Sequence, residues 1–333
     1  MSVPPARPRT MRAIVFSGPG RISVREIPSP EPGPGEALID VRLAGICGTD
    51  LQLARGYMGF AGVPGHEFVG TVREVASTAD RLLTGARVTG EINLGCQDCP
   101  LCADGIARHC PRRRVLGILG KEGAFAERLT LPVSNLHVVP DTISDRHAVF
   151  IEPVAAAFEI LDQVGVHAGQ RILVIGDGRL GLIVAQVLAS RGAAVTVAGR
   201  HESKLAVGRA LGLAGVLMDD SPVKERFDIV VEATGSTGGL DQALARVRPR
   251  GTVVLKSTCT GATTLDASRI VIDEVTIVGS RCGRFEPAIH ALRGGDVVVE
   301  PLITGEMPLD AGADAFDRAA QGETIKILLR VAA

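Results

Sequence analysis

Arg171-Ile-Leu-Val-Ile-Gly-Asp-Gly-Arg-Leu-Gly181 indicates the fold of this 333-residue chain more clearly than any other segment. Its first five residues form a short apolar run, and the rest has the pattern Gly-x-Gly-x-x-Gly. Between a strand and a helix, the first glycine makes the turn, the second admits a pyrophosphate and the third lets helix and sheet approach. Because residues 180–191 have a helical pattern, the stretch predicts a dinucleotide-binding unit with its cofactor contacts at Gly176, Gly178, Leu180 and Gly181.

Strand and helix patterns alternate from this stretch to about residue 296. Apolar runs at 194–198, 227–231, 252–255 and 275–278 are separated by segments with helical patterns, such as 202–211. Such alternation is typical of a parallel sheet with helices on both faces. We therefore predict an α/β fold whose doubly wound, Rossmann-type domain covers residues 154–296.

The residues before this domain have a different texture. Residues 11–153 are rich in Gly and Pro and contain short alternating apolar stretches, which favours a β-rich domain. Residues from about 297 to 333 return to this texture and are expected to complete that domain. Residues 1–10 contain Pro and Arg but no strand pattern, and we expect them to be a disordered extension.

Composition excludes several classes of function. The formal net charge is −1 at pH 7, aromatic residues make up 3% and Trp is absent, so neither a cationic surface nor a stacking platform for nucleic acid is expected. No apolar run approaches the roughly 20 residues that span a bilayer. The first residues also lack the apolar segment of a secretory signal. The sequence therefore predicts a cytoplasmic protein whose partner is a small molecule, with no nucleic acid and no membrane.

Four of the seven cysteines follow the pattern Cys96-x2-Cys99-x2-Cys102-x7-Cys110. Zinc accepts four thiolates in a tetrahedron, so a short irregular loop can wrap one ion. The alternatives are four unrelated buried thiols, which the spacing disfavours, and a nucleic-acid zinc ribbon, which the lack of a basic surface disfavours. Because protein would fill all four positions, the pattern predicts a closed, structural zinc site.

Three further segments carry metal-binding side chains: Cys47-Gly-Thr-Asp, Gly-His66-Glu67 and Glu152-Pro. A catalytic zinc has about three protein ligands and an open position for water or substrate. Cys47, His66 and one or both of Glu67 and Glu152 would form that set, and the residues leave the choice between the two carboxylates open. Each residue alone is more often an ordinary core or polar side chain. The prediction therefore rests on their occurrence together with the cysteine cluster and the glycine pattern.

The end of the second strand predicts which dinucleotide is bound. An NAD site has an acidic residue there, about 20 residues after the glycines, but this strand ends in Gly199, followed by Arg200. Gly199 would leave room for a 2′-phosphate and Arg200 could bind it, which favours NADP(H) over NAD(H). Lys204 is expected beside the same ribose, with a solvated helix lysine as the alternative. Thr234 and Ser257 follow the next two strands, where doubly wound sheets bind ligands.

These motifs occur in the order found in the zinc-containing medium-chain dehydrogenase/reductase superfamily, which the chain resembles from residue 11 to its end. The Glu-Pro form at 152–153 resembles the polyol, glucose and threonine dehydrogenase branches. The resemblance implies a GroES-like catalytic domain beside the Rossmann domain, and it implies that Lys326 lies near the cofactor pyrophosphate. It also implies a homodimer or homotetramer, which we expect to form through the edge strand 275–278.

The same resemblance assigns roles around the catalytic metal. It makes Cys47 and His66 zinc ligands, with Glu67 and Glu152 as direct or exchangeable ligands. Asp50 would accept a hydrogen bond from His66 and so fix the tautomer of the imidazole.

The predicted reaction is hydride transfer between an alcohol or polyol, or the corresponding aldehyde or ketone, and NADP(H). Zinc would act as Lewis acid on the substrate oxygen and Thr49 as proton relay, with two zinc ions per subunit. One alternative is a biosynthetic NAD(P)H-dependent carbonyl reductase, because the same catalyst serves both directions. Another is a non-enzymatic zinc- or nucleotide-binding protein, which would be expected to lack Cys47, His66 or the glycines, and all of these are present.

Overall fold

The computed structural model describes residues 9–218, 225–258, 263 and 265–331, so the extension predicted for residues 1–10 lies, up to residue 8, outside them. The chain forms two compact units. One comprises Met1–Val149, Gly305–Ala320 and Ile327–Ala333, and the other comprises Phe150–Thr304 and Gln321–Lys326. Among the helices of the described residues, none has the length and apolar character needed to cross a membrane.

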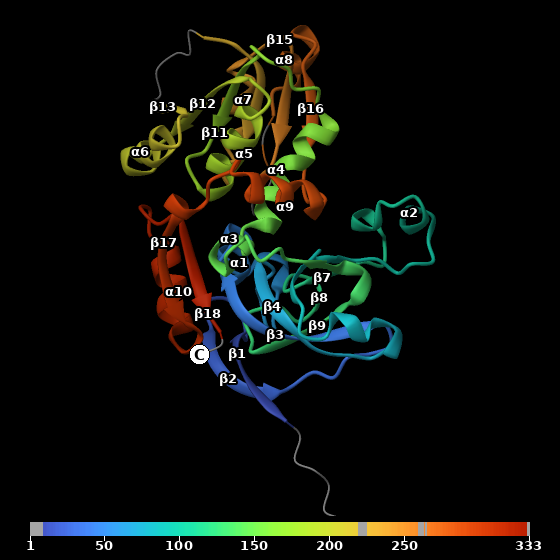
Figure 1. The fold of residues 1–333 in the computed structure, drawn as a ribbon. Coiled ribbons are helices and arrows are strands. Elements are labelled where there is room, and N and C mark those ends of the chain that lie inside the picture. Colours follow the sequence, from blue (N-terminus) through green and yellow to red (C-terminus); the bar gives the residue numbers. More distant parts are fainter. Residues whose placement is uncertain (1–8, 219–224, 259–262, 264, 332–333) are drawn as a thin grey trace, which may run out of the picture. The chain divides into compact units, whose positions relative to one another are not determined.

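A six-stranded parallel sheet forms the centre of the second unit (Figure 1). Residues 172–175 of its strand β11 are all buried, as expected for an apolar run covered on both faces. Each strand pairs in parallel with its neighbours, which confirms the predicted doubly wound fold. The spatial order is β13 (Ala214–Leu217), β12 (Ala194–Gly199), β11 (Arg171–Ile175), β14 (Phe227–Glu232), β15 (Val247–Leu255) and β16 (Thr276–Gly279).

Helices connect and cover these strands (Figure 1). Helix α4 packs against both α5 and α9. Residues 181–188 of α5 are buried on every side, so this helix lies within the core of the unit rather than at its surface. The helices are α4 (Ile151–Gln163), α5 (Arg179–Ala189), α6 (Glu202–Ala210), α7 (Gly239–Leu244), α8 (Ala267–Ile272) and α9 (Phe285–Gly294).

The first unit is built around β3 (Glu36–Gly45). This strand pairs antiparallel with β4 (Phe68–Val75) and β9 (Arg128–Pro132), and near its end with β18 (Lys326–Arg330). The resulting seven-stranded sheet has the order β10-β5-β4-β3-β18-β17, with β9 beside β3. The many short strands agree with the β-rich fold that the sequence predicted for this part of the chain.

The remaining elements of the first unit are short. Strands β1 and β2 form a two-stranded sheet, and β6, β7 and β8 form a three-stranded sheet. The four-cysteine segment connects β6 to β7 along the chain. The bounds are β1 (Thr10–Phe16), β2 (Ile22–Pro28), β5 (Arg87–Gly90), β6 (Asn93–Leu94), β7 (Arg114–Leu116), β8 (Gly120–Lys121), β10 (Leu136–Val138), β17 (Ile303–Pro308), α1 (Gly48–Ala54), α2 (Pro100–Ala103), α3 (Asp145–Ala148) and α10 (Gly312–Ala319).

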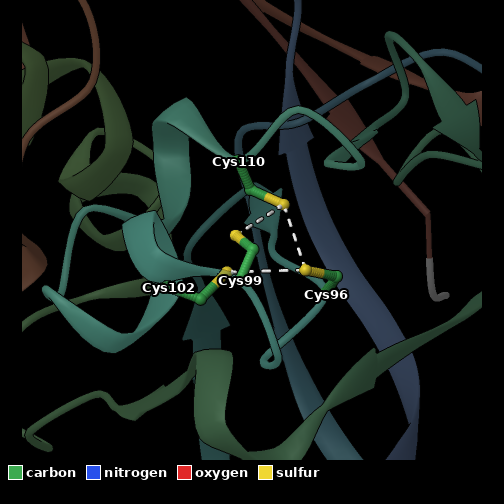
Figure 2. A group of neighbouring side chains, drawn as sticks. All are labelled: Cys96, Cys99, Cys102 and Cys110. Carbon is green, nitrogen blue, oxygen red and sulfur yellow. Dashed lines mark hydrogen bonds between the residues drawn. The ribbon is translucent and has the colours of Figure 1, made fainter.

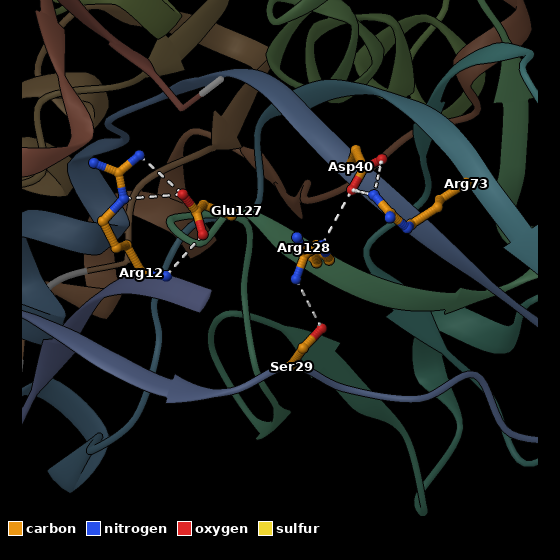
Figure 3. Close-up of polar contacts among 6 residues, drawn as sticks. All are labelled: Arg12, Ser29, Asp40, Arg73, Glu127 and Arg128. Carbon is orange, nitrogen blue, oxygen red and sulfur yellow. Dashed lines mark hydrogen bonds and ion pairs between the residues drawn. The ribbon is translucent and has the colours of Figure 1, made fainter. Parts of the chain in front are cut away.

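Polar pairs join neighbouring strands of the first unit (Figure 3). Arg12 of β1 donates to Glu127 from its backbone N–H and from its guanidinium, both at 2.9 Å. Asp40 of β3 accepts hydrogen bonds from Arg73 of β4 and Arg128 of β9 at 3.1–3.2 Å. Because these side chains are partly exposed, each pair adds little stability alone. Their effect is to fix which residues face one another across the strands.

Candidate active site and metal-binding clusters

Cys47 lies where the chain leaves β3 and begins α1. Its backbone N–H donates to the Asp50 carboxylate at 2.8 Å, so Asp50 caps the helix. The preceding N–H, that of Ile46, donates to the carbonyl of Ile327 at 3.0 Å. Thr49, the expected proton relay, is partly exposed in the first turn of α1. Hydrogen bonds from two successive N–H groups therefore fix the backbone that carries the Cys47 thiol.

His66 and Glu67 belong to the turn that enters β4. The Glu67 carbonyl accepts a hydrogen bond of 2.9 Å from the Gly45 N–H, which joins this turn to the end of β3. Both side chains are buried, with 3% and 0% of their surfaces exposed. The ligand atoms of Cys47, His66 and Glu67 all lie within 4.8 Å of one another. The fold thus brings together three of the four ligands predicted for a catalytic zinc, from two separate segments.

The charges around His66 suit a metal ion. Its Nδ1 lies 3.4 Å from Oδ1 of Asp50. Burial lowers the pKa of His66, but the negative charges of Asp50 and Cys47 outweigh it and raise that pKa well above its ordinary value. A dication would take the place of this proton, since zinc binds neutral imidazole, thiolate and carboxylate. The donor set therefore fits a zinc ion that keeps a position open for substrate.

Two glycines that the sequence analysis did not identify hold the turn before His66. A Cβ on Gly117 would lie 2.6 Å from the Gly65 nitrogen, and a Cβ on Gly123 would lie 2.5 Å from the carbonyl carbon of Pro64. Any larger residue at either position would therefore displace the turn that carries His66. With 40 glycines in the chain, neither stands out in the sequence.

Glu152, the fourth predicted ligand, belongs to the other unit, in the first turn of α4, and is 9% exposed. In that unit its negative charge acts on Lys256, which directly precedes Ser257 after the end of β15. The Lys256 ammonium donates to the Arg281 carbonyl at 2.8 Å. Burial lowers the pKa of Lys256 to about 8, against the opposing effects of Cys282, Glu152 and Glu159. Lys256 therefore links the ends of β15 and β16 through a partly buried cation.

The four cysteines of the second metal motif converge in a single loop (Figure 2). The sulfur atoms are separated by 3.4 Å for Cys96 and Cys110, 3.7 Å for Cys99 and Cys110, and 4.0 Å for Cys96 and Cys102. All four ligand atoms lie within 4.8 Å of one another. The Cys102 backbone N–H lowers the pKa of Cys99, but burial and the neighbouring thiols raise it to about 12. A divalent cation would relieve this crowding of ionisable thiols, so the loop fits the predicted zinc.

The glycine turn joins β11 to α5 and has the geometry expected of a pyrophosphate site. A Cβ on Gly181 would overlap the Gly176 carbonyl oxygen, so helix and turn approach too closely for any side chain. Gly178 caps the helix, and a Cβ there would meet no atom within 4 Å. Leu180 lies in the first turn of α5, partly buried. Open space in front of helix N–H groups fits the phosphates of a dinucleotide.

Other predicted cofactor residues lie at strand ends of the same unit. Thr234 and Ser257 both donate their hydroxyl groups to Oε1 of Glu232, at 2.6 and 3.2 Å. Glu232 is 3% exposed and was not predicted, although an acid directly before Ala-Thr-Gly at a strand end is a recognisable signal. Lys326 is 1% exposed, and its ammonium lies 5.6 Å from the centre of the Phe150 ring.

The end of β12 differs from the expectation in one respect. The room that the sequence analysis assigned to a 2′-phosphate at Gly199 is taken by the side chain of Asp177, because a Cβ on Gly199 would lie 2.5 Å from Cγ of Asp177. Arg200 is exposed, and Lys204 is 8% exposed in the first turn of α6. The expected basic residues are therefore present, but a carboxylate stands between the strand end and the glycine turn.

Comparison with known proteins agrees with this geometry. Residues 33–141 match the family described as the alcohol dehydrogenase GroES-like domain, and residues 145–331 match that described as the glucose dehydrogenase C-terminus. The chain belongs to the zinc-type medium-chain dehydrogenase family and is a zinc-type alcohol dehydrogenase.

Three similar proteins illustrate the range of that family. Sorbitol dehydrogenase of Halalkalibacterium halodurans is 28% identical over 96% of this chain and 99% of its own. A Sinorhizobium meliloti protein described as a zinc-binding dehydrogenase, bound to NADP, has a TM-score of 0.88 at 28% identity and covers 97% of this chain and 100% of its own. An Escherichia coli alcohol dehydrogenase in complex with NADH has a TM-score of 0.90 at 27% identity, with 97% and 99% covered. The fold therefore accommodates either dinucleotide.

Proposed function

We propose that this protein transfers a hydride between an alcohol or polyol, or the corresponding aldehyde or ketone, and NADP(H). One observation carries the proposal: a buried imidazole, a buried carboxylate and a thiol meet within 4.8 Å, at His66, Glu67 and Cys47. This donor set suits a zinc ion with an open position, which is what alcohol oxidation requires. The similarity to sorbitol and arabinitol dehydrogenases supports a hydroxylated substrate.

Each residue has a task in this proposal. When bound, zinc polarises the substrate oxygen and the nicotinamide ring accepts or gives the hydride. Cys47, His66 and Glu67 hold the ion, and Asp50 orients His66. The Thr49 hydroxyl moves the proton between the substrate oxygen and solvent. Glu152 is a second candidate carboxylate ligand on the strength of the family resemblance alone.

The second ion of the proposed pair is held by Cys96, Cys99, Cys102 and Cys110, and its task is structural. Four thiolates leave no position for substrate, so this ion can order the loop but cannot take part in the reaction. Reduced thiols in such numbers also suit the cytoplasm.

The preference for NADP(H) rests on the cations at the end of β12. Arg200 is exposed and forms no hydrogen bond or ion pair that involves another described residue, so its guanidinium is available to a 2′-phosphate. Lys204 lies one turn further along α6. The NADP bound to the Sinorhizobium meliloti protein is consistent with this preference.

We also propose a homodimer or homotetramer that forms through β16. This strand lies at the edge of the six-stranded sheet, so one side of its backbone is open to pairing. The neighbouring helix α8 exposes Val271 and Ile272 by 75% and 77%. Apolar surface beside an open strand edge is typical of a contact between identical chains.

The experiment that tests the proposed function is a panel of alcohols, polyols, aldehydes and ketones, assayed with NADP(H) and NAD(H) side by side. The proposal predicts turnover of at least one hydroxylated substrate, with the faster rate with NADP(H), and a loss of about 1000-fold or more in kcat/KM for Cys47→Ser. Turnover of Cys47→Ser at the wild-type rate would rule out the catalytic zinc, and a strong preference for NAD(H) would rule out the assignment of Arg200.

A further inference from the structure

The glycine turn contains a buried acid whose position was not predicted. Asp177, between the first two glycines, is 7% exposed. Its Oδ2 accepts a hydrogen bond of 2.7 Å from the backbone N–H of His201, and both carboxylate oxygens lie 3.1 Å from Nδ1 of the same residue. The carboxylate is therefore anchored to the chain directly after the end of β12, where the ribose of a dinucleotide is bound in this type of fold.

Gly199, the last residue of β12, shows more closely where the Asp177 side chain lies. A Cβ on Gly199 would lie 2.5 Å from Cγ of Asp177, so the two side chains compete for one space. The φ angle of Gly199 is not positive, and the glycine is therefore required for room and not for backbone conformation. The Asp177 side chain thus stands where a side chain at the strand end would begin, and its carboxylate lies within one side-chain length of the usual ribose-binding acid.

Both negative and positive side chains surround this position. Burial lowers the pKa of Lys204, and the negative charges of Asp177 and Glu323 act against that effect. Arg200 adds an exposed cation at the same strand end. A ribose 2′-hydroxyl can donate to a carboxylate, whereas a 2′-phosphate carries nearly two negative charges and is repelled by it. The charge of this carboxylate therefore opposes the attraction of the cations for a 2′-phosphate.

We infer that Asp177 is the residue that discriminates between the two dinucleotides. The acid that other dinucleotide sites place at the end of the second strand is supplied here by the glycine turn. Its carboxylate favours the 2′-hydroxyl and counteracts the attraction of Arg200 for the 2′-phosphate. The inference rests on the proposed function, because it presupposes that this unit binds a dinucleotide. It implies that the preference for NADP(H) is small and that Asp177 keeps it small.

The test is the dissociation constant of NADPH and of NADH for the intact protein, measured by isothermal titration calorimetry. Asp177→Asn keeps the shape of the side chain and removes its charge. We expect it to raise the NADPH affinity relative to the NADH affinity by about tenfold, which is about 1.4 kcal/mol. The control is Glu225→Gln, which removes a carboxylate paired with Arg171. Glu225 precedes β14 and Arg171 begins β11, so this pair lies at the amino ends of the strands, whereas the glycine turn follows the carboxyl end of β11. The ratio for this control should stay within about twofold of the wild-type ratio.

A second variant keeps the inference testable if Asp177→Asn does not fold, which thermal unfolding would reveal. Asp177→Gly combined with Gly199→Asp moves the carboxylate from the turn to the strand end, and it should bind NADH at least as well, relative to NADPH, as the wild type does. An unchanged ratio in Asp177→Asn, or weaker NADPH binding relative to NADH, would overturn the inference while the proposed function stands. A double variant that favours NADPH would overturn it as well. If the wild type bound neither dinucleotide, the proposed function would fail and this inference with it.

Discussion

The two candidate metal-binding clusters of the first unit are built in opposite ways. Four cysteines occupy one loop of fifteen residues, 96–110, whose regular structure is limited to α2 and a single helical turn. Cys47, His66 and Glu67 instead come from two segments that the pairing of β3 with β4 brings together. In the loop the thiols are near one another in space because they are near in sequence. In the second cluster the sheet brings together side chains that are distant in sequence.

This difference indicates what each ion does for the protein. The backbone hydrogen bonds within residues 96–110 join residues at most five positions apart, so an ion that links Cys96 to Cys110 would contribute directly to the order of the loop. The other cluster is held by the Asp50 cap, by the hydrogen bond between Gly45 and Glu67 and by close packing around the turn of His66. The backbone of this cluster therefore does not depend on an ion, and an ion bound there would be available for chemistry. We therefore predict that loss of the ion in the four-cysteine loop destabilises the protein and that loss of the ion at Cys47, His66 and Glu67 inactivates it.

The largest effect on activity is expected for Cys47→Ser. Loss of the zinc that polarises the substrate oxygen removes several kcal/mol of transition-state stabilisation, so kcat/KM should fall by about 1000-fold or more. The midpoint of thermal unfolding should change little, because the backbone of this cluster is held by the sheet. Steady-state kinetics and calorimetry on the same sample check both statements, and equal losses of activity and stability would contradict the comparison.

Cys110→Ser is the matched change in the loop, and we expect the opposite result. Loss of a structural ion should lower the free energy of unfolding by about 3 kcal/mol. The folded fraction should keep its activity within about tenfold. Limited proteolysis followed by mass spectrometry should locate new cleavage sites between residues 96 and 110. If the loop stayed resistant and the activity disappeared, the roles of the two clusters would have to be exchanged.

Gly123→Ala tests the packing around His66 without changing any of the candidate metal ligands. Its Cβ would lie 2.5 Å from the carbonyl carbon of Pro64, so the turn before His66 must move. A small displacement of a catalytic group costs about 100-fold in rate, and we expect kcat to fall by that order. Gly294→Ala is the control, because its Cβ would lie 3.5 Å from Asp296, in ordinary contact at the end of a helix. Similar rates for the two variants would show that the turn is not held as described.

Asp50→Asn is expected to have the smallest effect. The amide oxygen can still accept from the Cys47 N–H, but the negative charge beside His66 is lost. Partners of this kind typically change metal affinity by about 10- to 100-fold. Competition with a chromogenic chelator should show one ion released more readily than in the wild type, while the ion of the four-cysteine loop is retained. Easier release of both ions would contradict the separation of the two clusters.

The sequence was most informative where function depends on neighbours along the chain. The spacing of Cys96 to Cys110 and the pattern around Gly176 both correspond to local geometry, and alternating strands and helices were sufficient for the α/β fold. Contacts between distant residues were not predictable in this way. The packing of Gly123 against Pro64 depends on how two loops meet, and sequence spacing does not encode it.

The end of β12 shows the same limit at one position. Gly199 alone suggested an empty space for a 2′-phosphate. The space is filled by Asp177, which lies 22 positions before Gly199 in the chain. A missing side chain in a sequence says nothing about which neighbour fills the gap, because that depends on tertiary packing.

The most direct test of the account is the zinc content per chain, measured by inductively coupled plasma mass spectrometry while a chelator is titrated and activity is followed. We predict two zinc ions in the wild type, with activity lost as the first is removed and the free energy of unfolding lowered only with the second. Cys47→Ser should contain one ion and remain folded. A wild type that contains a single ion, held by the four-cysteine loop, and is nonetheless fully active would contradict the account.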